Sequence, residues 1–299
     1  PLTRTPDAHF LTEVRYKGTK VVSVSPDYAE STTSSDAWLN VKAGTDAALA
    51  MAMGHVILKE YYIDKETPYF KEYAKEFTDM PFLVRVEDIN GAVQPGRFLN
   101  AKDLGRQEEG ADFHMVLIDE ITNEIVIPNG TMGERHTNPQ KWNLRLENRD
   151  TGAKIDPRLS VFDQREDVTV VKLPYFGDEE HEGVIERAIP TITVQTVDGP
   201  VKVTTVYDLI LANYGIDRGI GGEVATSYTD DTPYTPTWQE KITGVKADIA
   251  IATAREFADN AEKTKGRSMI IMGGGINHWY HADVIYRTIL NLIMFCGTE

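Results

Sequence analysis

A chain of 299 residues with 41% hydrophobic and 26% charged side chains is long enough for one large globular domain or two ordinary ones. Its 31 basic and 46 acidic side chains give a formal net charge of −15, which argues against a surface that binds nucleic-acid phosphates. A single cysteine excludes a disulfide framework and any iron–sulfur cluster ligated by this chain alone.

The ends and the apolar runs indicate what kind of chain this is. No apolar run approaches the roughly 18 residues that a membrane span needs. The sequence starts at Pro1, without a signal peptide, and stops at Glu299 directly after an apolar helical pattern. We therefore expect it to be a piece of a longer protein.

Residues 1–64 alternate between helical and strand patterns. Asp7 can cap a first helix, and a second helix with apolar residues at helical spacing is predicted from Asp46. Between them, residues 21–24 form a short apolar run that ends near Pro26, which is typical of a buried parallel strand. The pattern predicts part of a doubly wound α/β domain.

Residues 65–200 have a different character, with shorter apolar clusters and frequent proline, glycine, asparagine and charge. Segments such as residues 88–91 are typical of loops. We predict an irregular insertion that contains short strands. The β-like runs lie at residues 115–118, 125–127, 168–173 and 191–196.

The α/β pattern returns in residues 201–299. Thr205 can cap a helix that runs to Tyr214, with Asp208 completing a short-armed capping box, and a second helix is predicted near residues 247–261. Residues 268–272 then predict a buried strand. This segment is interpreted as part of a second doubly wound domain, so the predicted fold class is α/β.

The run of Gly273, Gly274 and Gly275 follows that predicted strand and precedes a helix. Glycines there let a backbone approach a phosphate or pyrophosphate closely, and a helix N-terminus offers unpaired N–H groups. The alternative is a turn that allows tight packing of strand against helix. His278 and His281 stand three residues apart and could ligate a metal, although polar side chains at a helix start are the simpler interpretation.

A second candidate site combines two short segments near the start of the chain. Ser25, Pro26 and Asp27 follow the first predicted strand, and Gly44, Thr45 and Asp46 precede the second predicted helix. Ligands of doubly wound sheets bind beyond the carboxyl ends of the strands, where an acidic residue can accept from ribose hydroxyls or from the donors of guanine. An ordinary helix N-terminal charge explains Asp46 alone equally well.

Several motifs surround these positions. They are TRTPDAHF (3–10), EVRYKGTK (13–20), SPDYAE (25–30), GTDAA (44–48), AMGHV (52–56), TTVYDL (204–209), AREFADNA (254–261) and NHWYH (277–281). Together they resemble the molybdopterin oxidoreductases, and within them the family of membrane-bound respiratory nitrate reductases. The motifs occur in the family's order and cover nearly the whole chain, with the weakest likeness between residues 84 and 200.

The resemblance implies an enzyme that carries molybdenum in bis-molybdopterin guanine dinucleotide (bis-MGD) and reduces nitrate to nitrite with electrons from quinol. The two doubly wound α/β domains would then be dinucleotide-binding-like, and each would hold one nucleotide. The residues that the resemblance places at the cofactor are Thr3 and Arg4 (pterin and phosphates), Ser25, Pro26 and Asp27 (one guanosine), Gly44, Thr45 and Asp46 (its guanine), and Gly273, Gly274, Gly275 and Asn277 (the second dinucleotide).

His278 is the catalytic candidate that the resemblance implies, standing near molybdenum and donating a hydrogen bond to a nitrate oxygen or to an oxygen on the metal. The family's aspartate ligand to molybdenum and its iron–sulfur cluster ligands would lie before Pro1, so the 299 residues alone are expected to be inactive. The implied partners are an iron–sulfur beta subunit and a heme-containing membrane gamma subunit, with the complex at the cytoplasmic face of the membrane.

Three other interpretations stay open from the sequence. The same scaffold could reduce another oxyanion or act on a different substrate, or it could serve as a non-catalytic nucleotide-binding module. A metal-dependent hydrolase that uses His278 and His281 is a more distant possibility.

Overall fold

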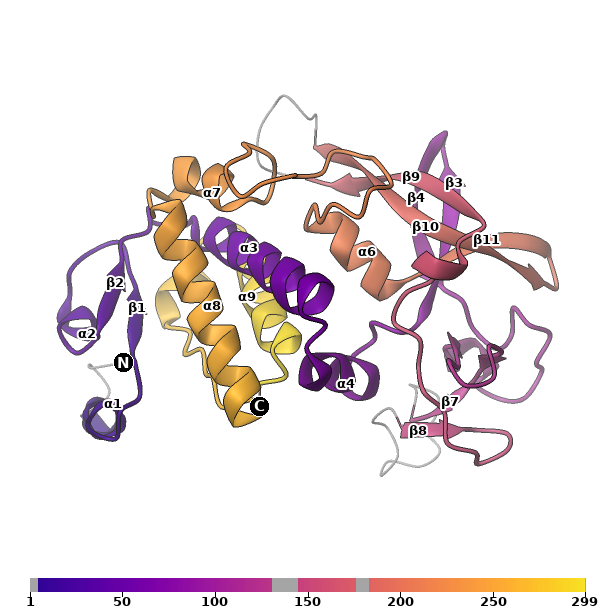
Figure 1. Cartoon of the computed structure of the whole chain (residues 1–299), viewed down its shortest axis with the longest axis horizontal. Coiled ribbons are helices and arrows are strands. Elements are labelled where there is room, and N and C mark those ends of the chain that lie inside the picture. Colours follow the sequence, from indigo (N-terminus) through magenta and orange to yellow (C-terminus); the bar gives the residue numbers. More distant parts are fainter. Residues whose placement is uncertain (1–4, 131–144, 176–182, 299) are drawn as a thin grey trace. The chain divides into compact units, whose positions relative to one another are not determined.

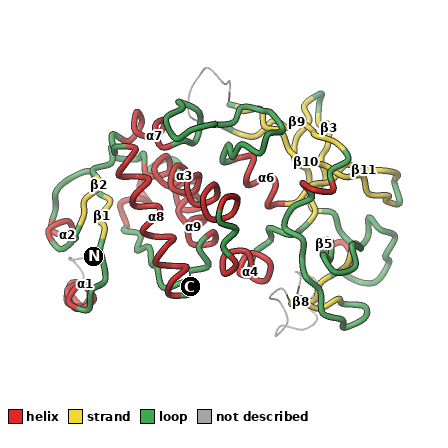
Figure 2. The backbone as a smooth tube through the Cα atoms, in the orientation of Figure 1, coloured by secondary structure: helices red, strands yellow, loops and turns green. Residues whose placement is uncertain are grey.

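The computed structural model of the chain describes residues 5–130, 145–175 and 183–298, with the backbone alone at residues 5–7, 30 and 31. These residues form helices and sheets in two compact units (Figures 1 and 2). The first unit joins residues 1–59 to residues 227–299, and the second comprises residues 60–226. The predicted mixture of helices and strands is thus confirmed.

The first unit is mainly helical. Its two short strands, β1 (Val22–Val24) and β2 (Ala37–Leu39), pair in parallel with Val22 opposite Ala37. The helical elements of this unit are α1 (Thr5–Tyr16), α2 (Glu30–Thr33), α3 (Asp46–Ile57), α7 (Pro236–Thr243), α8 (Ala247–Thr264), the 3₁₀ helix η5 (Gly274–His278) and α9 (Ala282–Phe295).

Helix α3 is the centre of this unit and packs against α7, α8 and α9 (Figure 1). Alanines and aliphatic side chains on most of its circumference are buried, as expected of a helix that is apolar all round. Helix α8 contributes a stripe of small side chains at helical spacing, which lets its backbone come close. The buried stripe of α8 is Ala250, Ala254, Ala258 and Ala261.

The predicted strand at residues 268–272 is wrong. This segment has no strand or helix assignment, and the side chains of Met269 and Ile271 are 75% and 63% exposed. A strand needs a hydrogen-bonding neighbour, and among the described residues none pairs with this segment. Apolar composition alone therefore overestimated both its burial and its regularity.

The second unit is built around an antiparallel sheet with strand order β4-β3-β11-β10-β9. The core on this sheet includes Leu83, Leu99, Val116 and Val203. Its sheet strands are β3 (Leu83–Ile89), β4 (Ala92–Phe98), β9 (Asp167–Pro174), β10 (Val184–Thr196) and β11 (Gly199–Thr205). The remaining elements are the π-helix η1 (Leu58–Asp64), which starts at the end of the first unit, α4 (Pro68–Phe77), η2 (Ala111–Phe113), β5 (Leu117–Ile118), β6 (Ile125–Val126), β7 (Pro128–Asn129), β8 (Arg145–Asn148), η4 (Phe162–Gln164) and α6 (Val206–Asn213).

The four β-like runs predicted between residues 65 and 200 all contain strand. The interpretation of residues 88–91 as loop missed a hairpin, because Asn90 and Gly91, both at positive φ, form the two-residue turn between β3 and β4. The strand β11 and the helix α4 were also missed. The predicted cap of α6 is confirmed, since the Thr205 hydroxyl accepts from the Asp208 backbone N–H at 3.0 Å.

Within the described residues, every helix is too short or too polar to cross a lipid bilayer.

Candidate functional site

Two of the predicted segments lie at the same edge of the small parallel sheet. Ser25 follows β1 and the segment leading to Gly44 follows β2, and parallel strands end at the same side. The backbone also links them, because the Ser25 N–H donates to the Leu39 carbonyl at 3.2 Å. This is the location at which doubly wound sheets bind ligands.

The Ser25-Pro26-Asp27 turn is held by its own polar groups. The Ser25 hydroxyl lies 2.9 Å from the Asp27 carbonyl oxygen and 3.0 Å from Asp27 Oδ1. The Trp38 indole N–H donates to the Ser25 carbonyl at 2.9 Å, and Tyr28 packs edge-on against the Trp38 ring. Pro26 and Asp27 are exposed. Hydrogen bonds and a ring contact thus support the turn, and Asp27 presents a carboxylate to solvent.

The second turn leads directly into α3. Gly44 has φ +81°, a conformation that favours glycine, and the Thr45 hydroxyl donates to the Lys42 carbonyl at 2.6 Å instead of capping the helix. Asp46, the first residue of α3, is half-buried, and this burial raises the pKa of its carboxyl above the ordinary value. Burial of this carboxyl disfavours its charged form.

The three glycines lie in an open, exposed turn at the start of η5. A Cβ atom built on Gly273, Gly274 or Gly275 would meet no other atom within 4 Å, and none of the three has a positive φ. The chain's own packing therefore does not require glycine at these positions. This observation favours close approach of a ligand over the alternative of tight strand–helix packing.

The structure places the histidine candidates in different elements. Asn277 and His278 are exposed residues of η5, while His281 precedes α9 at its N-cap. Among the described residues, no group of three or more histidine, cysteine, aspartate or glutamate side chains could hold a metal ion. The geometry thus offers no support for the hydrolase interpretation.

Trp279 contacts the Gly44 turn and so connects the two groups of candidate residues, which no pattern in the sequence predicts. A Cβ on Gly44 would lie 3.2 Å from both Cδ2 and Cε3 of the Trp279 indole, so this ring covers the turn that precedes Asp46. Because Trp279 directly follows His278, the η5 turn and the Gly44–Asp46 turn are neighbours. No local sequence signal marks a contact between residues so far apart.

Thr3 and Arg4, which the resemblance places near the pterin and its phosphates, lie outside the described residues.

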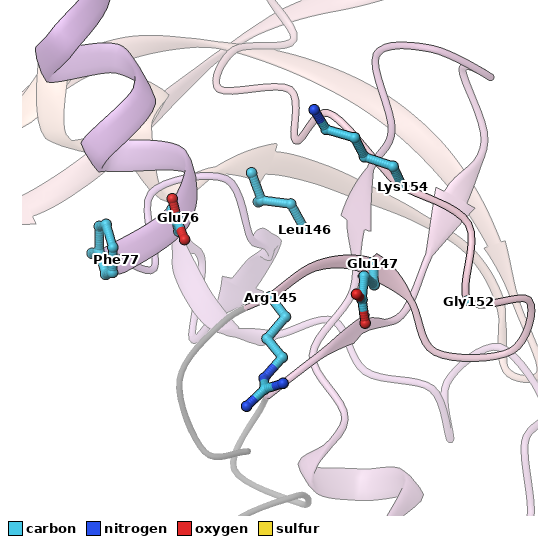
Figure 3. Close-up of a pocket in the computed structure, with 7 residues that line it drawn as sticks. All are labelled: Glu76, Phe77, Arg145, Leu146, Glu147, Gly152 and Lys154. Carbon is cyan, nitrogen blue, oxygen red and sulfur yellow. The ribbon is translucent and has the colours of Figure 1, made fainter. Parts of the chain in front are cut away.

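The second unit contains a separate pocket of about 580 Å³ between α4 and β8 (Figure 3). Its lining mixes two acidic and two basic side chains with Phe77, Leu146 and Gly152, and it includes none of the predicted site residues. We therefore locate the candidate site in the first unit. The pocket is lined by Glu76, Phe77, Arg145, Leu146, Glu147, Gly152 and Lys154.

Known proteins identify the class to which this arrangement belongs. A model of the molybdopterin oxidoreductase family matches residues 2–299, and the chain belongs to that family. It is 52% identical over its whole length to the nitrate reductase alpha chain of Bacillus subtilis (strain 168). Over 99% of its length it is 48% identical to the respiratory nitrate reductase 1 alpha chain of Escherichia coli (strain K12) and 32% identical to the perchlorate reductase subunit alpha of Dechloromonas aromatica (strain RCB).

The chain spans about a quarter of the length of these relatives, since it covers 24% to 26% of each. Family membership implies a molybdenum–pterin cofactor, and the described residues fit parts of such a group. The exposed glycines leave room for a ligand against the backbone, and Asp27 follows the carboxyl end of β1, the side at which doubly wound sheets bind ligands. Asp46 is half-buried at the start of α3.

Proposed function

We propose that the chain is the central part of the catalytic subunit of a molybdenum nitrate reductase that converts nitrate to nitrite in anaerobic respiration. The observation that carries this proposal is the 52% identity, over all 299 residues, to a nitrate reductase alpha chain. The 32% identity to a perchlorate reductase subunit makes reduction of a chlorine oxyanion the second candidate.

The form of the cofactor in this proposal is bis-MGD. Asp46 would accept hydrogen bonds from the ring N–H and the exocyclic amine of one guanine, and the Ser25–Asp27 turn would border the attached ribose. The backbone of Gly273, Gly274 and Gly275, with Asn277, would lie along the second dinucleotide. Oriented amides and a few side chains suffice to hold such an anion, which explains how a chain of net charge −15 could bind it.

When bound, the cofactor supplies the electrons that remove one oxygen from nitrate. The part of this chain in that step would be played by His278, which is exposed at the end of η5 and could donate a hydrogen bond to a nitrate oxygen. Thr3 and Arg4 are proposed to lie near the pterin and its phosphates.

The proposed partners are an iron–sulfur beta subunit and a heme-containing gamma subunit, at the cytoplasmic face of the membrane. The observation behind them is that the relatives are named as alpha chains, which implies further subunits. An iron–sulfur cluster in the catalytic subunit itself would need ligands outside this chain, which has one cysteine.

The test uses the complete protein that contains this chain, purified anaerobically from a host that makes the cofactor. Molybdenum is measured by elemental analysis, guanine by nucleotide release, and nitrite by its formation with a reduced viologen donor. We expect molybdenum and guanine to be present in stoichiometric amounts and nitrite to be formed. A protein that holds metal and guanine but reduces chlorate or perchlorate faster than nitrate would favour the second candidate, and one without metal would contradict both.

A further inference from the structure

The indole of Trp279 occupies an unusual position for a large aromatic side chain. It is 44% exposed, so it does not belong to the core, yet it lies against the backbone of Gly44 from a residue more than 230 positions later in the chain. The backbone of Trp279 closes the η5 turn. The Trp279 N–H donates to the Ile276 carbonyl at 3.4 Å, and the Ala282 N–H donates to the Trp279 carbonyl at 3.1 Å.

The contact fixes two helix starts against each other. Gly44 lies two residues before α3 and Trp279 three residues before α9, and these two helices pack together. The N-termini of α3 and α9 therefore lie at the same end of the helix pair. Gly44 is suited to this contact because any side chain there would meet the ring at 3.2 Å and would also be strained at φ +81°.

We propose that Trp279 is a positioning residue that couples the Gly44–Asp46 turn to the η5 turn, so that the guanine-binding carboxylate and His278 are held in one fixed arrangement. This inference rests on the proposed function for the identity of the ligand, but the coupling itself is a property of the chain. The indole acts through Asp46 and His278 and does not take part in the chemistry.

Tyr280 provides a matched control. It is an aromatic residue of the same turn, it is 93% exposed, and its ring packs edge-on against His281 at 4.6 Å, not against Gly44. Trp279→Ala removes the coupling ring, Trp279→Phe keeps a smaller aromatic ring at the same place, and Tyr280→Ala removes a neighbouring ring that lacks the contact.

The first measurement is hydrogen exchange of the backbone amides in the complete protein. We expect Trp279→Ala to increase the exchange rate of residues 42–46 and 273–278 together by about tenfold, while Trp279→Phe partly restores protection and Tyr280→Ala leaves residues 42–46 unchanged. Faster exchange confined to residues 273–278 would overturn the proposal, because it would show that the indole stabilises only its own turn.

The second measurement is the rate at which the purified holoenzyme releases guanine nucleotide in mild denaturant. Trp279→Ala should speed release by about tenfold, which corresponds to 1.4 kcal/mol, and Tyr280→Ala should not. If the unmodified protein holds no guanine, the proposed cofactor fails and the hydrogen-exchange result still decides the coupling. If it holds guanine and Trp279→Ala releases it at the unmodified rate, the coupling to the ligand is wrong.

A double-mutant cycle keeps the proposal testable should Trp279→Ala lower the yield. Gly44→Ala places a methyl group against the indole and adds backbone strain. In the Trp279→Ala background only the strain remains, and in the Trp279→Phe background a smaller ring meets the added methyl group. The loss of thermal stability caused by Gly44→Ala should therefore be smaller in both backgrounds than in the unmodified protein. Losses equal to that in the unmodified protein would mean that the ring does not press on this turn.

Discussion

The most informative single residue of the candidate site is Asp46, because burial disfavours the negative charge of its carboxylate. The carboxyl is half-buried at the start of α3, and desolvation raises its pKa although a helix N-terminus favours a negative charge. Ionisation of a carboxyl whose pKa is raised by burial lowers the stability of the fold.

Asp46→Asn should therefore have opposite effects on stability and on cofactor retention. Because the folded-state pKa is raised, the folded chain holds the proton more tightly, and stability falls as the pH rises from about 4 through the folded pKa. The variant removes this decrease, so its cofactor-free form should melt at a higher temperature at pH 7. An amide amine facing the donors of guanine should at the same time cost about 1–3 kcal/mol of cofactor binding. Thermal scans from pH 4 to 7 and the guanine content of the holoenzyme test the two halves. Unchanged guanine content would remove Asp46 from the site.

His278→Ala tests the catalytic candidate. The side chain is exposed at the end of η5, so truncation should leave the fold and the molybdenum content nearly unchanged. Nitrite formation should fall by about 10²-fold, which is typical for the loss of a hydrogen-bonding or acid–base group. Loss of metal together with activity would instead indicate a structural role, and near-normal turnover would exclude His278 from the reaction.

At the scale of single residues, the sequence predicted the local position of several candidate residues well and their contacts poorly. The positions of Ser25, Asp27 and Asp46 at strand ends and a helix start follow from local patterns, and the structure places them there. The contact of Trp279 with Gly44 depends on how distant helices pack, and no local pattern carries that information.

Among the elements, α6 is the one whose start is most strongly determined by buried polar groups. Asp208 is fully buried and accepts from the Ser160 hydroxyl at 2.6 Å, the Val161 N–H at 2.9 Å and the Arg218 guanidinium at 2.6 Å. The sequence predicted Asp208 only as part of a local capping box, because its long-range partners are set by tertiary packing.

Asp208→Ala should destabilise the protein by about 3–5 kcal/mol, since it leaves the buried Arg218 guanidinium without its carboxylate. Chemical denaturation followed by circular dichroism gives this value directly. Asp167→Ala is the control, because the Asp167–Lys202 pair is exposed on both sides and its loss should hardly change the unfolding midpoint. Similar effects of the two substitutions would contradict the expectation that the buried Asp208–Arg218 ion pair stabilises the protein more than the exposed Asp167–Lys202 pair.

The turn after β4 should show a measurable acid dependence. Burial opposes ionisation of Asp103, but hydrogen bonds from Arg97 and from the Asn100 backbone N–H outweigh it and lower the pKa of the Asp103 carboxyl. A lowered folded-state pKa stabilises the fold above the unfolded value of about 4, and this contribution is lost as the pH falls through the folded pKa. Asp103→Asn should therefore be less stable by about 1.5–3 kcal/mol at pH 7. In denaturant titrations the difference between the two proteins should shrink as the pH falls below about 4 and through the folded-state pKa. A constant difference at all pH values would show that the charge is not responsible.

Helices were predicted better than strands because a helix forms its own hydrogen bonds, whereas a strand exists only through a partner. The helices that contain Asp46 and Thr205 follow from caps and periodicity, and both are present. Residues 268–272 have the composition of a strand but no partner in the described part of the chain. The β3–β4 hairpin was missed although its Asn90-Gly91 turn is a recognised signal.

For the molecule as a whole, the candidate site depends on residues from both ends of the chain. Residues 25–46 and residues 273–279 lie in the unit that joins residues 1–59 to residues 227–299. The sequence divided the chain at residues 64 and 200 into parts of two cofactor-binding domains separated by an insertion. That these parts belong to separate domains of the complete protein stays a prediction.

The two units should differ in their ability to fold when separated. Residues 60–226 are continuous and contain a five-stranded antiparallel sheet with its own buried core, so this segment expressed alone should unfold cooperatively in denaturant. Residues 1–59 alone lack α7, α8 and α9, against which α3 buries most of its surface, and should show little helix by circular dichroism. Mixing residues 1–59 with residues 227–299 should restore part of that helical signal. A non-cooperative transition in residues 60–226, or a stable helical fold in residues 1–59 by themselves, would contradict this division of the chain.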